Sequence, residues 1–148
     1  MVINPIESDD AIAGCYPVLV QLRPHLRAEE FVARIRQQMQ EGYRLVGLRV
    51  DGRVQAVAGF RVLNTLAVGR QLYVDDLVTA EASRSRGYGA TLLNWLVEWA
   101  REQGCEQFHL DSGVQRYRAH RFYFAQGMHI VYYHFAMNLK PENNSSAN

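Results

Sequence analysis

The stretch from Leu72 to Ala100 constrains the fold of this chain more than any other, because it predicts a strand, a glycine-containing loop and a helix in succession. Residues 72–79 have the length and β-branched content of a buried strand. Residues 91–100 are rich in Leu, Trp and Ala, as a packed helix is. Between them, Gly87 and Gly89 allow close approach to a ligand, and the helix start offers free N–H groups and a positive dipole end. The stretch therefore predicts a phosphate or pyrophosphate site.

Two familiar phosphate-binding patterns fit this loop poorly. A P-loop requires Lys and Ser/Thr directly after its last glycine, whereas Ala90 and Thr91 follow Gly89 and the only lysine is Lys140. A dinucleotide fingerprint requires a third glycine where Leu92 stands, and its first glycine should follow the strand almost at once. Because Asp111 mimics the acid that binds ribose, a nicotinamide dinucleotide oxidoreductase remains an alternative.

A third pattern fits in residue type and in spacing. Residues 84–89 read R-x-x-G-x-G, which resembles the signature of the GNAT superfamily of acetyl-CoA-dependent N-acetyltransferases. Residues 119–128 resemble a second family motif, A-x-x-[FL]-Y-x-x-x-G-F, with Met128 in place of the final Phe. Many members have Asn three residues before that alanine. Here Arg116 stands there, so no cofactor contact is carried over to it.

The predicted elements follow the order of the GNAT architecture. We expect strands at 1–6, 43–50, 53–63, 71–79, 106–111, 128–131 and 134–139, and helices at 11–22, 28–41, 91–100 and 116–126. Ser8, Asp9 and Asp10 are N-cap candidates, and Pro17 predicts a kink or two short helices. Asp51-Gly52 predicts a type I′ turn, and Gly59 predicts a bulge. The resemblance implies an α/β fold with a mostly antiparallel mixed sheet of 6–7 strands and about four flanking helices.

Length and composition limit the classes of protein that are compatible. The 148 residues predict one domain over 1–140, with a disordered polar tail over 141–148. A net charge of 16 − 15 = +1 argues against a nucleic-acid or polybasic membrane partner. With no long apolar run and no signal peptide, a cytoplasmic location is expected, and a homodimer is the default oligomer. Cys15 and Cys105 are expected to be reduced buried thiols, and no metal-ligand spacing occurs among the five histidines.

The resemblance implies direct transfer of acetyl from acetyl-CoA to an amine, without a covalent enzyme intermediate. In the family, the strand before the loop splays from its neighbour, and its backbone pairs with the pantetheine arm; the amide of Leu77 would then donate to the thioester oxygen. The implied cofactor-binding residues are Leu77, Val78 and Thr79 on the strand and Arg84, Ser85, Arg86, Gly87, Tyr88, Gly89 and Ala90 in the loop.

Two residues match catalytic positions of the family. Tyr123 matches the general acid that protonates the departing CoA thiolate, and a phenol with a pKa of about 10 is protonated at neutral pH. Asp75 matches an acidic residue that removes the proton of the amine in some relatives. Strand alternation predicts that Asp75 and Asp76 lie on opposite faces. The alternatives are that Tyr123 is a packed aromatic, and that one aspartate binds substrate while the other pairs with an arginine.

The acceptor site, by resemblance, is formed around residues 22–31 and by Tyr132, Tyr133 and His134. Its mixed aromatic and charged character is compatible with a small-molecule or peptide amine and names no particular one. An acyl-CoA-binding sensor of the same fold, without turnover, is the alternative function.

Overall fold

The structure is a computed structural model that describes residues 1–141. The chain forms two compact units, Met1–Asp111 and Ser112–Asn148. Within the described residues, no helix is long and apolar enough to cross a bilayer.

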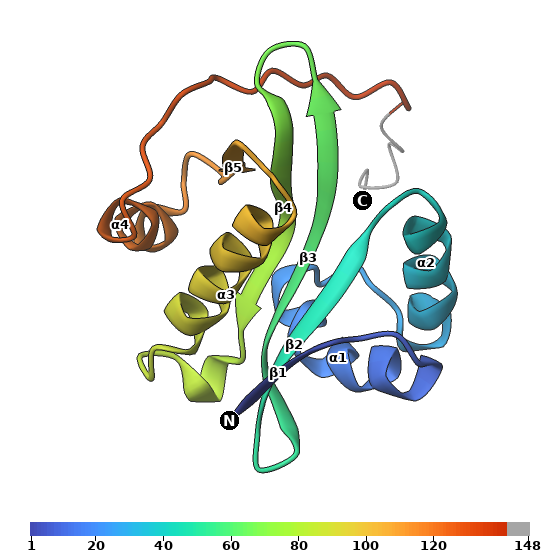
Figure 1. Ribbon diagram of the computed structural model, residues 1–148. Coiled ribbons are helices and arrows are strands. Elements are labelled where there is room, and N and C mark those ends of the chain that lie inside the picture. Colours follow the sequence, from blue (N-terminus) through green and yellow to red (C-terminus); the bar gives the residue numbers. More distant parts are fainter. Residues whose placement is uncertain (142–148) are drawn as a thin grey trace. The chain divides into compact units, whose positions relative to one another are not determined.

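The first unit is built on one five-stranded mixed sheet, with the order β1-β2-β3-β4-β5. The strands are β1 (Val2–Pro5), β2 (Arg44–Val50), β3 (Arg53–Thr65), β4 (Gly69–Thr79) and β5 (Gln107–Leu110). The first four pair antiparallel, and β5 joins β4 in parallel. Helices α1 (Asp9–Leu22) and α2 (Ala28–Gln40) cover one face, and α3 (Tyr88–Glu102) covers the other (Figure 1). The mixed α/β class predicted from the sequence is confirmed.

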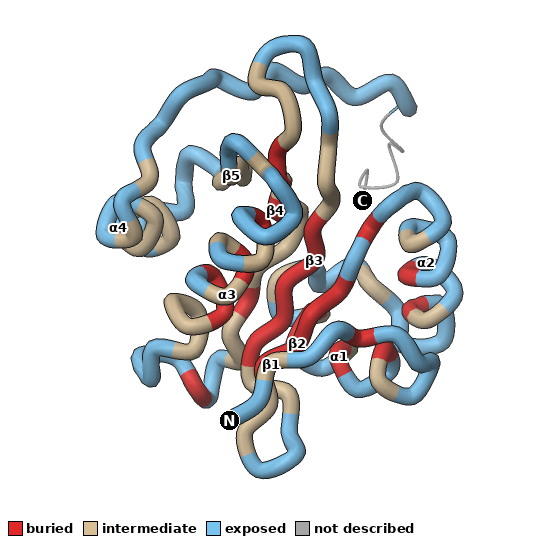
Figure 2. Tube along the Cα trace, in the orientation of Figure 1, coloured by how far each residue is buried: buried red, intermediate tan, exposed pale blue. Residues whose placement is uncertain are grey.

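Strand alternation divides the core into two clusters, one on each face of the sheet. Val57 packs with the α1/α2 cluster, whereas its neighbours Ala56 and Ala58 pack with the α3 cluster. Buried residues are concentrated along β2, β3 and β4 (Figure 2). Cys15 is fully buried, as predicted, but Cys105 is only partly buried; both are free thiols.

Several local predictions are confirmed by backbone geometry. The Ser8 side chain accepts from the amide of Ala11 at 3.2 Å and caps α1. Asp51 and Gly52 both have positive φ, 50° and 77°, as a type I′ turn requires. Pro17, however, lies inside one continuous helix, so the prediction of two short helices is wrong. Buried residues of α1 lie on both sides of Pro17, and their packing outweighs the lost hydrogen bond.

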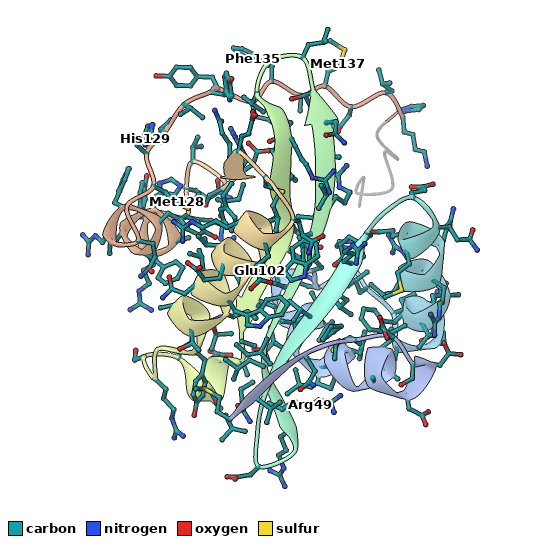
Figure 3. All side chains as sticks on the ribbon, in the orientation of Figure 1. Arg49, Glu102, Met128, His129, Phe135 and Met137 are labelled. Carbon is teal, nitrogen blue, oxygen red and sulfur yellow. The ribbon has the colours of Figure 1, made fainter. Side chains whose placement is uncertain are left out.

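The second unit contains α4 (Tyr117–Ala125) and an extended segment after it. The strands predicted at 128–131 and 134–139 are wrong: the described chain forms no strand there, so the sheet has five strands rather than six or seven. Apolar alternation predicts which face a strand would bury, but a strand also requires a backbone partner. Phe135 and Met137 project from this segment and are 92% and 82% exposed (Figure 3). Apart from residue 141, the predicted tail lies outside the described residues.

Candidate functional site

The loop between β4 and α3 presents a group of free backbone donors. A short 3₁₀ turn, η1 (Glu81–Ser83), follows β4, and α3 begins at Tyr88 with Gly87 as its N-cap. Ser85 and Gly87 have positive φ, 69° and 81°. The first hydrogen bond of the helix runs from the amide of Thr91 to the carbonyl of Gly87, at 3.0 Å. Within the described chain, the amides of residues 85–90 have no hydrogen-bond acceptor, so they can receive an anion.

Contacts to β3 and α1 hold this loop in place. The amide of Ala80 donates to the carbonyl of Gln55 at 2.8 Å, and the Ser83 hydroxyl donates to the Gln55 side chain. The amide of Glu81 donates to the Gln21 side chain at 2.8 Å. The loop is therefore anchored, whereas the side chains of Arg84 and Arg86 are exposed. Within the described residues these two arginines form no ion pair, and they add positive charge beside the free amides.

The strand that leads into the loop has an open backbone edge. Parallel pairing of β4 with β5 covers only Gln71–Val74, and no described residue of β5 pairs with residues 75–79. On its other side, β4 remains paired with β3 as far as Thr79. The backbone of Leu77, Val78 and Thr79 is thus available on the β5 side to an extended ligand.

A bulge in β4 reverses the prediction that Asp75 and Asp76 face opposite ways. Asp76 pairs with Gly59 and Val74 with Phe60, so Asp75 has no partner on β3. Val74 and Leu77 consequently pack with the same α3-side cluster although three positions separate them. Both aspartates face the α1/α2 side, and the alternation prediction is wrong because it assumed a regular strand. The sequence predicted a bulge at Gly59; the register does shift next to Gly59, but the extra residue is Asp75 on the partner strand β4.

The two carboxylates have different partners. Asp75 is held by both nitrogens of the Arg61 fork, at 2.8 Å each. Asp76 accepts from Arg23 Nε and from the Tyr43 hydroxyl, both at 2.9 Å. Arg23 also donates to the carbonyl of Asp75 at 3.0 Å. Each aspartate is thus fixed in position by an arginine.

Gly59 is the residue that brings Tyr43 to Asp76. A Cβ at Gly59 would lie 1.7 Å from the Tyr43 hydroxyl oxygen and 2.2 Å from Cζ, so the ring lies directly against the glycine backbone. Burial first, and then the Asp76 carboxylate, raise the pKa of Tyr43 well above its usual range. Tyr43 therefore stays protonated and donates to Asp76 at every physiological pH.

A cavity of about 260 Å³ lies between α1, α2 and β4. Its apolar wall is formed by Leu19, Leu26, Phe31 and Ile35, and its polar wall by Arg23, His25, Arg34, Gln38, Tyr43 and Asp76. Asp76 lines this cavity and Asp75 does not. The cavity thus reaches the residue next to Leu77 and includes part of the region expected to bind an acceptor.

Tyr73 forms a further polar contact on β4. Its hydroxyl donates to the carboxylate of Asp111 just after β5, and the Arg61 guanidinium lies over its ring at 5.3 Å. Burial first, and then Asp111, raise the pKa of Tyr73. Asp111, the residue that a dinucleotide site would need for ribose, is here a partner of Tyr73.

Tyr123 lies on α4 of the second unit. Its ring packs against Phe122 with centroids 5.4 Å apart, and its carbonyl accepts from the amide of Met128 at 3.1 Å. Burial raises the pKa of Tyr123, and the charge of Arg116 opposes that shift. The phenol is therefore protonated at neutral pH, as a proton donor must be.

The first unit thus brings together the loop, the open edge of β4 and both aspartates, whereas Tyr123 belongs to the other unit. Sequence reasoning missed Tyr43, Arg61 and Arg23 as the partners that fix the aspartates. The only signal for them was Gly59, which predicted a bulge but not the residue that would lie against it.

Comparisons with known proteins agree on one family. The model of the acetyltransferase (GNAT) family matches residues 8–128. The chain is 36% identical to the uncharacterized N-acetyltransferase YhdJ of Bacillus subtilis over 122 residues, which cover 82% of this chain and 86% of that protein.

Two relatives with named acceptors match over shorter stretches. An aminoalkylphosphonate N-acetyltransferase of Salmonella typhimurium is 33% identical over a stretch that covers 45% of this chain and 43% of that protein. An aminoglycoside N(6')-acetyltransferase (type 1) of Serratia marcescens is 29% identical over a stretch that covers 41% of this chain and 44% of that protein. Among solved structures, a putative acetyltransferase from Agrobacterium tumefaciens superposes with a TM-score of 0.81 at 22% identity, over 93% of this chain and 99% of that one.

Proposed function

Because the chain belongs to the GNAT acetyltransferase family, we propose that it transfers the acetyl group of acetyl-CoA directly to the amine of a small acceptor. The observation that carries the proposal is the joint occurrence, in one unit, of the free amides of the loop and the unpaired edge of β4. A pyrophosphate needs several donors at one place, and an extended amide-containing arm needs an open strand edge.

The loop residues bind the anionic end of acetyl-CoA in this proposal. The amides from Ser85 to Ala90 donate to the pyrophosphate, and Arg84 and Arg86 add charge. The arm then extends along Leu77–Thr79, and the amide of Leu77 donates to the thioester oxygen as negative charge develops on it. Gly87 and Gly89 leave the backbone accessible to the phosphates.

The acceptor amine attacks the thioester carbon, a C–N bond forms, and the C–S bond breaks to release CoA as a thiolate. Tyr123 supplies the proton to that sulfur; its raised pKa keeps the phenol protonated until then. The amine loses its own proton to a carboxylate. Asp75 remains our sequence-based assignment of that base, and Asp76 is the alternative that the cavity favours, since only Asp76 lines it.

Three variants separate these roles. Tyr123→Phe should lower kcat by about 10²-fold without changing acetyl-CoA affinity, because it removes a proton donor and nothing else. Asp75→Asn should alter the limb of the pH–rate profile that rises with pH if Asp75 is the base, because a base acts only when deprotonated. An unaltered profile in that variant and an altered one in Asp76→Asn would transfer the role to Asp76.

The first experiment is the thermal stability of the protein with acetyl-CoA, free CoA, NAD or NADP, followed by detection of thiol release with a panel of amines. A ligand at 100 times its dissociation constant adds about 2.7 kcal/mol to the stability of the folded state. Stabilisation by acetyl-CoA and CoA, together with thiol release, supports the proposal. Stabilisation without release for any amine indicates an acyl-CoA sensor, and stabilisation by a dinucleotide alone contradicts the proposal.

A further inference from the structure

We propose that the acceptor is a short amine that also carries an acidic group, a carboxylate or a phosphonate, and that Arg34 binds this group. The inference rests on the proposed acetyl transfer and adds the chemical class of its acceptor. It is carried by the charge balance of the cavity between α1, α2 and β4.

The cavity contains more positive than negative charge. Among the described residues, Asp76 is the only carboxylate in its lining, and Arg23 already pairs with it at 2.9 Å. Arg34 also lines the cavity, and within residues 1–141 its side chain forms no ion pair. One arginine charge is therefore left for a ligand to neutralise.

The acid that would ordinarily neutralise Arg34 is engaged elsewhere. Glu30 lies four residues before Arg34 on α2, a spacing that commonly gives an ion pair on a helix. In the structure, Glu30 instead lies 3.8 Å from Arg27, which also binds Glu29. Arg34 and Gln38 are exposed and one turn apart on α2, so they form the rim of the cavity with donors that can reach an anion.

The two ends of the cavity fit the two ends of such an acceptor. Asp76 lies beside Leu77, where the thioester is expected, so the amine end of the acceptor would lie at this end of the cavity. The apolar side chains of Leu26, Phe31 and Ile35 also line the cavity and suit a short aliphatic spacer. At about 260 Å³ the cavity is slightly smaller than most small-molecule sites, which favours an acceptor of few atoms.

The test compares primary amines of equal chain length that end in a methyl group, a carboxylate, a phosphonate or a second amine. We expect kcat/KM for at least one acidic series to exceed that of the alkylamine by about tenfold or more, and the diamine to be the poorest acceptor. The carboxylate and phosphonate series distinguish the two sources of the anion. Arg34→Gln should raise KM for the preferred acid about tenfold while kcat, and the kinetics with the alkylamine, stay unchanged.

Arg36→Gln is the matched control. Arg36 lies two residues further along α2, binds Asp9 at 2.7 Å and does not line the cavity, so its loss should leave the acid preference intact. Equal kcat/KM for acidic and neutral amines, or the same KM change in the Arg34 and Arg36 variants, would overturn the inference while acetyl transfer itself stands.

A binding measurement gives an answer that does not depend on turnover. Simple aliphatic carboxylic and phosphonic acids, which lack the amine, should raise the Tm of the wild type and of Arg36→Gln but not that of Arg34→Gln. Failure of every acid to stabilise the wild type overturns the inference even if alkylamines are acetylated. Failure of acetyl-CoA to bind, with acids still stabilising through Arg34, would count against the proposed reaction and leave the anion site supported.

Discussion

Replacement of Gly59 by Ala should destabilise the protein more than its small size suggests, because the new methyl group would occupy the position of the Tyr43 ring. The added Cβ would lie 1.7, 2.2 and 2.5 Å from three atoms of that ring, where no real Cβ is tolerated. The backbone of Gly59 is not in the left-handed region, so the effect of the substitution is purely steric. The ring must move, and its hydrogen bond to Asp76 is lost.

The magnitude follows from two losses. Overpacking of a tight site costs about 2 kcal/mol, and loss of a hydrogen bond to a carboxylate costs about 2 kcal/mol more. We therefore expect Gly59→Ala to lower the free energy of unfolding by about 4 kcal/mol, and Tyr43→Phe, which loses only the hydrogen bond, by about 2 kcal/mol. Urea unfolding followed by circular dichroism measures both values.

A double-mutant cycle tests the steric cause directly. In a Tyr43→Leu background the three clashing atoms are absent, so adding Gly59→Ala should cost less than about 1 kcal/mol. Gly14→Ala is the control: Gly14 has no atom within 4 Å of its would-be Cβ and lies inside α1, so alanine should stabilise by about 0.5–1 kcal/mol. A Gly59→Ala protein as stable as the wild type, or additive costs in the cycle, would refute the packing argument.

Two further predictions concern the loop and the core. Gly87→Ala should lower the free energy of unfolding by about 1–2 kcal/mol and weaken acetyl-CoA binding, because φ is +81° at this residue; no atom lies near the new Cβ, so the cost is one of backbone conformation. Gly89→Ala, inside α3, is the control for stability. Equal stability of the two variants in urea would contradict this explanation. Burial raises the pKa of Cys15 from 9.0 to about 11, so the stability from its neutral thiol is complete below pH 9 and is lost as pH rises towards 11. The stability difference between the wild type and Cys15→Ala should therefore narrow by roughly 3 kcal/mol over that range, and a constant difference in unfolding experiments across these pH values would be the contrary result.

Much of the fold and the candidate loop could be predicted from the sequence because their signals are local. Each of these signals depends on a few neighbouring residues: the N-cap candidates Ser8, Asp9 and Asp10, the type I′ turn at Asp51-Gly52, and the glycine loop between a strand and a helix. The preference of such residues for particular φ and ψ values is the same in any fold. The order of elements then indicated a mixed sheet with helices on both faces.

The tertiary structure decided which side chains meet. The bulge turned Asp75 and Asp76 to the same side, and the contact of Tyr43 with Gly59 selected the partner of Asp76. Within the described residues, Arg34 has no ion-pair partner, and Glu30, which has the spacing to pair with it, lies beside Arg27 instead. In the same way, the strands predicted at 128–131 and 134–139 are absent from the described residues, because a strand also needs a backbone partner. Local sequence determines which conformations a segment prefers, whereas pairing, packing and charge balance depend on residues that only the folded chain brings together.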